Sequence, residues 1–188
     1  MRIISTLILF AVLISSVLAD AKVPVREIRR SPNGRYFVAW FDYEAGAPIG
    51  LIRPVMIRST SDPYDIFSFV SIPRSTDAAW NTASTQCVIA DAPDNGGPTT
   101  WLIYRKRPQE WASKVIDPFT TLYESFRKTD PEIRHLFRPS ILKITWLSDT
   151  KVQFRGYCNT GTYLITIDTT KPNQSPLTKK LSDECLDE

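Results

Sequence analysis

The sequence predicts a small, mainly β domain that carries a short helical insertion. Two observations lead to this fold class. The 188-residue chain contains 14 prolines together with 9 Phe, 7 Tyr and 5 Trp, a composition typical of a turn-rich β protein and unlike that of a disordered chain. Aromatic and β-branched runs also recur between turn signals, and two proline-initiated segments have helical periodicity.

The N-terminus has the pattern of a secretory signal peptide. Arg2 is followed by an apolar stretch at 3–14 and by small or compact residues that lead to Ala19. About 17 residues separate Arg2 from the first acidic residue, which is short of the roughly 20 that a membrane-spanning helix needs. We therefore expect residues 1–19 to be cleaved near Ala19 (or Ala21), releasing a secreted or periplasmic protein with no stable membrane insertion.

Strands and turns alternate in the first part of the mature chain. A Pro-Asn-Gly turn lies at 32–34, where Pro fixes one dihedral and Asn-Gly tolerates positive φ. A second turn is expected at 59–64. The strands expected around these turns are 36–41, 52–58 and 66–72.

Two later segments resemble each other. Each is a strand that ends in Trp, at Trp80 or Trp146, followed by a polar turn and a hairpin. The strands expected in these segments are 78–80, 86–90, 100–104, 144–146, 151–156 and 163–167. They complete a single mainly β domain spanning 20–170, and the polar residues 171–188 are expected to form an irregular surface tail.

The insertion between the two segments, at about 109–138, has a different character. Asp117-Pro118 and Asp130-Pro131 each place a capping carboxylate before a proline at the first helical position. Apolar residues then recur with helical spacing, which predicts two short amphipathic helices at 118–128 and 131–137. The apolar positions are Phe119, Leu122, Tyr123, Phe126, Ile133, Leu136 and Phe137.

The segment Ser31-Pro32-Asn33-Gly34-Arg35-Tyr36 resembles the Ser-Pro-Asp-Gly turn of TolB-type bacterial β-propeller repeats. The segments at Trp80 and Trp146 are similar to the same repeat, with the turn replaced by 81–84 and 147–149. The resemblance covers about a third of the chain, and a closed propeller needs four or more blades of about 40 residues. It implies two or three antiparallel blade-like sheets, as a partial propeller or a sandwich, and it implies no particular function.

The cysteines indicate a disulfide rather than a metal site. Three are present, without Cys-x-x-Cys spacing, and His135 is the only histidine, which argues against zinc or redox chemistry. Cys158 starts a hairpin turn and Cys185 lies in the tail, so we expect a Cys158–Cys185 disulfide that leaves Cys87 free and buried. The sequence indicates no cofactor.

The charge of the chain argues against some partners. The formal net charge is +3, or about +2 after loss of the signal peptide, which predicts neither nucleic acid nor an anionic membrane as partner. Two basic clusters, at 26–30 and 105–107, are interpreted as solvated charge that protects strand edges.

Two classes of function remain open. The favoured one is a non-enzymatic protein-interaction or accessory module that contacts another extracytoplasmic protein, because no nucleophile–base pair or metal motif is present. The aromatic residues proposed for partner binding are Trp111, Tyr123 and Phe126; alternatively, the helical face packs on the sheet. The second class is a secreted hydrolase of polysaccharide or peptide. The sequence does not identify the carboxylate site of such a hydrolase. The pairs Asp62/Asp65 and Asp91/Asp94 could serve glycoside hydrolysis, but as turn residues they need no catalytic role. Oligomeric state is left open.

Overall fold

The computed structural model describes residues 25–41, 53–71, 75–92, 99–129, 139–171 and 174–182. The expected signal peptide, the expected helix at 131–137 with His135, Asp94 and Cys185 all lie outside the described residues. Within the described ranges, no helix has the length and apolar character needed to cross a membrane.

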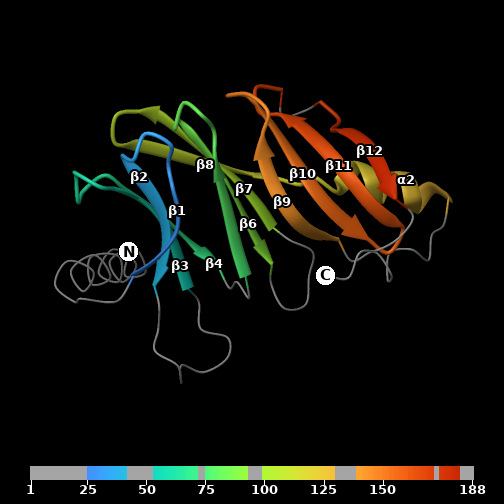
Figure 1. The fold of residues 1–188 in the computed structure, drawn as a ribbon, viewed down its shortest axis with the longest axis horizontal. Helices are drawn as coiled ribbons and strands as arrows, with labels where there is room; N and C mark the ends of the chain where they lie inside the picture. The colour runs from blue at the N-terminus through green and yellow to red at the C-terminus, as the bar shows by residue number, and fades with distance from the viewer. Residues whose placement is uncertain are drawn as a thin grey trace, which may run out of the picture.

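The described residues form three four-stranded antiparallel sheets. Figure 1 shows how they follow one another along the molecule. The first sheet contains β1 (Val25–Arg30), β2 (Tyr36–Phe41), β3 (Arg53–Ser59) and β4 (Ile66–Ser71). The second contains β5 (Ser75–Trp80), β6 (Gln86–Ala92), β7 (Thr99–Arg107) and β8 (Glu110–Ile116). The third contains β9 (Ser140–Trp146), β10 (Lys151–Cys158), β11 (Gly161–Asp168) and β12 (Leu177–Ser182). In each sheet every strand pairs with its sequence neighbour, and none of the sheets closes into a barrel.

Side chains hold the turns between the first and second strands of the first two sheets, which explains why the chain reverses there. After β1, the Ser31 hydroxyl accepts a hydrogen bond from the Tyr36 N–H at 3.0 Å, and Gly34 takes φ of 71°. After β5, the buried Asn81 carboxamide accepts N–H bonds from Thr85 and Gln86 at 2.9 and 3.0 Å. Such short polar side chains satisfy backbone groups that a strand would otherwise pair.

Two hydrophobic cores hold the three sheets together. Strand β5 contacts both β1 and β9, the first strands of the other two sheets. The core between the first and second sheets includes Val38, Ile57 and Ile103. The core between the second and third sheets includes Leu102 and Phe154, and it is extended by α2 (Thr120–Thr129). Burial alternates along β10, which places Val152, Phe154 and Cys158 in the second of these cores.

The structure confirms a mainly β fold and corrects two segments. The expected insertion at 109–138 does not begin as a helix, because Glu110–Ile116 is strand β8 paired with β7. The expected irregular tail at 171–188 contains β12, which pairs with β11. The helix expected at 118–128 is confirmed as α2, which begins two residues later. It is the one helix of the described ranges.

Candidate functional site

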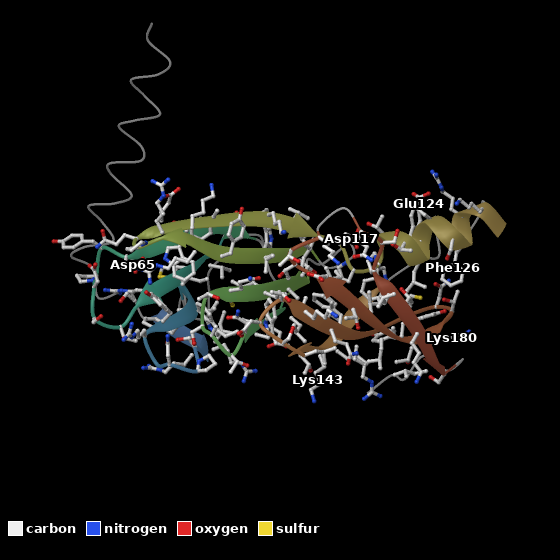
Figure 2. All side chains as sticks on the ribbon, turned by 90° about the horizontal axis from the view of Figure 1, so that it is seen from above. Asp65, Asp117, Glu124, Phe126, Lys143 and Lys180 are labelled. Atoms are coloured by element: carbon white, nitrogen blue, oxygen red, sulfur yellow. The ribbon has the colours of Figure 1, made fainter. Side chains whose placement is uncertain are left out.

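A buried carboxylate joins the first two sheets. Asp65 lies at the end of the turn that precedes β4 and is 3 % exposed; Figure 2 labels it. Its Oδ1 accepts a hydrogen bond from the Trp111 indole N–H on β8 at 2.8 Å. Its Oδ2 accepts one from Arg105 Nη2 on β7 at 3.2 Å, which makes an ion pair. We call Asp65, Arg105 and Trp111 the inter-sheet clamp.

Aromatic rings enclose the clamp. Tyr36 packs edge-on against Trp111, with ring centroids 5.1 Å apart, and Trp80 lies 6.2 Å from Trp111. The Arg105 guanidinium lies 5.2 Å from the centroid of the Tyr36 ring and 5.7 Å from that of Trp111, and it also donates to the Tyr36 hydroxyl. Cation–π contacts of this kind add to the ion pair. Every charged group of the clamp is therefore engaged, and the arrangement is suited to joining sheets rather than to proton transfer.

The other candidate carboxylates do not form a catalytic pair in the described residues. Asp62 is half-buried, and the N–H of Tyr64 followed by the Gln109 amide lowers the pKa of its carboxyl from the ordinary 3.8. This is the behaviour of a turn residue. The side chain of Asp91, like the whole of Asp94, is outside the described part. No group of three or more His, Cys, Asp or Glu in the described part could hold a metal ion.

The structure gives different positions to the residues proposed for partner binding. Trp111 was expected on a helix-like stretch; that placement is wrong, because it lies buried on β8 in the clamp. Phe126 is half-buried on α2, 6.5 Å from the Tyr163 ring, and Tyr123 is half-buried beside it. Phe119 and Leu122 are buried in the core. These contacts favour packing of α2 on the third sheet, and a role of the three aromatic residues in partner binding stays a prediction.

The start of α2 is fixed by a cap, as the sequence predicts. The Asp117 carboxylate accepts a hydrogen bond from the Phe119 N–H at 2.9 Å. Figure 2 shows Asp117 at the start of the segment that leads into the helix carrying Glu124 and Phe126. The cap satisfies one N–H that the helix leaves without an internal partner.

Both cysteines in the described part of the chain are buried. Cys87 is a free thiol, completely buried on β6, and its burial raises the pKa well above the ordinary value. It is therefore unsuited to nucleophilic attack. Cys158 is buried at the end of β10, with its Sγ 3.0 Å from the Thr160 hydroxyl. The expected disulfide to Cys185 stays a prediction because Cys185 is outside the described residues.

A cleft of about 360 Å³ lies between the second sheet and the end of β11. Tyr104, Lys114 and Thr170 are among the residues that line it. Lys114 Nζ donates to the Thr169 carbonyl at 3.0 Å and lies 6.0 Å from the Tyr104 ring centroid. The described residues of the lining include no carboxylate, so they offer no acid–base pair for hydrolysis.

The clamp could not be found from the sequence. Arg105 was interpreted as solvated edge charge and Asp65 as a turn residue, but packing of the second sheet against the first brings the two together across 40 positions. No protein-family model matches this chain, and a search of curated proteins finds no significantly similar sequence.

Proposed function

We propose that this chain is a non-enzymatic, extracytoplasmic protein-interaction module built from three blade-like sheets. The observation that carries the proposal is that the last strand of each sheet is an open edge with an exposed aliphatic side chain. The fourth strand of each sheet has only one neighbour in the described part of the chain, and each exposes a large aliphatic side chain. These are Ile66 on β4, Val115 on β8 and Leu177 on β12, which are 45 %, 58 % and 73 % exposed.

Repeated contacts between the sheets support the blade-like reading. The Trp80 indole at the end of β5 donates to the Arg29 carbonyl near the end of β1, at 3.4 Å. The Trp146 indole at the end of β9 donates in the same way to the Ala79 carbonyl near the end of β5, at 2.9 Å. The same residue type thus joins each sheet to the preceding one at an equivalent position, as expected for a repeated unit.

The turns that follow the first strands support the same reading. Gly34 N–H donates to the Ser31 carbonyl at 2.9 Å, and Ser84 N–H donates to the Asn81 carbonyl at 3.0 Å. Gly34 and Ser84 both have positive φ, at 71° and 59°. The turn at 81–84 therefore has the backbone form of the turn at 31–34 without its glycine, which supports kinship with propeller repeats.

Binding is favoured over hydrolysis because the buried carboxylate is already engaged. Asp65 accepts two hydrogen bonds from the clamp, and Asp62 is held in its turn by Tyr64 and Gln109. Neither is free to act as nucleophile or general base. An exposed sheet edge, in contrast, offers backbone donors and acceptors to a partner strand.

The extracytoplasmic location rests on the N-terminal sequence. The apolar stretch after Arg2 and the small residues before Asp20 support export and cleavage. An exposed sheet edge of this protein would then bind its partner in the periplasm or outside the cell.

Site-specific photo-crosslinking tests the function. A photoreactive residue is placed at Ile66, Val115 or Leu177 of the full chain, in the cells that produce it, with the exposed turn residue Thr82 as control position. The proposal predicts that at least one edge position crosslinks to a distinct protein and that Thr82 does not. It is overturned if no edge position exceeds the control, or if the purified chain hydrolyses generic glycosidase or peptidase substrates.

A further inference from the structure

The outward face of the third sheet carries a row of cations. Lys143 on β9 lies directly opposite Arg155 on β10, Arg155 lies opposite Leu164 on β11, and Leu164 lies opposite Lys179 on β12. Residues paired in this way point to the same side of a sheet. We call Lys143, Arg155 and Lys179 the basic row. All three are exposed, and Figure 2 shows Lys143 pointing away from the body of the protein.

Among the described residues, no acidic side chain lies directly beside the basic row; Asp168, on the same face, lies opposite Lys151, four positions along β11 from Leu164. None of its three side chains makes an ion pair with a described residue. The positions beside Arg155 on the same face are polar and uncharged, with Gln153 Nε2 donating to the Thr166 hydroxyl at 3.4 Å. Like charges placed opposite one another, such as Lys143 and Arg155, destabilise a sheet pair. A row without counter-charges is therefore best matched by an anionic group from outside.

The basic row ends at an edge that is open to strand addition. Strand β12 pairs with β11 and with no other described strand, and its residues are exposed from Leu177 to Leu181. Leu177 and Lys179 lie on the same face as the row, so this edge presents an apolar side chain next to a cation. Lys179 would repel the β12 strand of a second copy, as lysines on edge strands commonly do.

We propose that β12 accepts an extended acidic segment of a partner protein as an added strand. The segment's main chain pairs with β12, and its alternate side chains place carboxylates near Lys179 and an apolar group against Leu177. The remaining cations of the row, Lys143 and Arg155, attract the segment from further across the sheet. This inference rests on the proposed function and names the partner's chemistry.

A polypeptide fits these features better than other polyanions. Nucleic acid backbones and lipid headgroups can meet the cations but cannot form a strand ladder with β12. Single-stranded nucleic acids also rely on aromatic side chains for base stacking. The outward face of the third sheet offers one half-buried tyrosine, Tyr157, among its described residues. Main-chain pairing therefore distinguishes the proposed occupant.

Binding of a defined probe to the purified full chain tests the inference. The probe is a synthetic peptide of about ten residues, slightly longer than a typical strand, in which Glu and Val take turns at every second position with Thr between them, so that one face carries both Glu and Val. Control probes are the same peptide with Lys in place of Glu, the Glu peptide with Pro at alternate positions, single-stranded DNA, and phosphatidylglycerol vesicles. The variants are Lys143→Glu/Lys179→Glu and, as matched control, Arg35→Glu/Lys106→Glu, which makes the same charge change at exposed positions elsewhere.

The inference predicts that the Glu peptide binds and that the Lys and Pro peptides do not. Lys143→Glu/Lys179→Glu should weaken binding about tenfold more than the control variant, and salt should weaken it further. Equal effects of the two variants, equal binding of the Pro peptide, or tighter binding of DNA or vesicles would each overturn it. A protein crosslinked at Ile66 or Val115 alone would also overturn it, yet would leave the proposed function standing.

Discussion

Replacing Asp65 with Ala should destabilise the fold strongly, because it breaks the inter-sheet clamp. The substitution leaves the Arg105 guanidinium without its counter-ion and the Trp111 indole N–H without its acceptor. Removing one partner of a buried ion pair costs about 3–5 kcal/mol of unfolding free energy. The Arg105 side chain is 26 % exposed, so water recovers part of that cost and the lower end, about 3 kcal/mol, is expected.

Thermal unfolding followed by circular dichroism and tryptophan fluorescence measures this effect. For a domain of this size, about 3 kcal/mol corresponds to a fall in the midpoint of roughly 6–12 °C. Asp65→Asn should fall between wild type and Asp65→Ala, because the amide oxygen can still accept from Trp111. Asp62→Ala is the matched control, three positions away in the same turn but only half-buried and outside the clamp, and should have a much smaller effect. A fall for Asp65→Ala no larger than that for Asp62→Ala would refute the clamp.

Four further predictions concern processing, covalent structure, packing and pH. Mass spectrometry of the exported protein should show loss of about 19–21 residues, and intact carbonate-resistant membrane material would contradict the signal peptide. Non-reducing peptide mapping should show Cys158 joined to Cys185, a bridge that would contribute about 3 kcal/mol; any other pairing refutes it. Tyr123→Ser/Phe126→Ser should lower the free energy of unfolding by about 2 kcal/mol, because both rings are half-buried, and the thermal midpoint should fall accordingly. An unchanged midpoint together with loss of a co-purified partner would instead place the interface on α2. The folded state lowers the pKa of the Asp62 carboxyl below 3.8, so the stability that this group contributes is present above pH 3.8 and is lost as the pH falls through the lower folded value. The stability of Asp62→Asn should therefore fall less steeply with pH in that acid range. The same dependence on pH in Asp62→Asn and wild type would contradict this.

The sequence predicts those strands whose pattern of burial is strong. Strand β10 alternates Val152 and Phe154 in the core with exposed Lys151 and Arg155, so the two-residue period of a strand can be recognised in the sequence itself. The turn at Gly34 can also be predicted from the sequence, because glycine is the residue that most readily adopts the positive φ found there.

The segments that were misjudged lack such patterns. Strand β12 buries no side chain, so only main-chain pairing with β11 makes it a strand. Strand β8 follows a tight turn in which Gln109 takes positive φ, without the Asn or Gly that usually marks a hairpin. Trp111 therefore looked like part of the helical insertion that follows it.

The candidate sites depend on contacts between distant residues. Asp65 and Trp111 are 46 positions apart and meet only when the first and second sheets stack. The basic row likewise requires the register of β9, β10, β11 and β12, which composition does not give. A net charge of +3 over the chain conceals this local excess of cations.

Hydrogen exchange at the outer sheet edges tests most directly the claim that the chain acts by binding a protein strand. Amide exchange is measured for β4, β8 and β12 of the full chain, with and without saturating acidic peptide. The account predicts slower exchange of those β12 amides that do not pair with β11, and unchanged exchange in β4 and β8. Unchanged exchange throughout β12 while the peptide is bound would contradict strand addition.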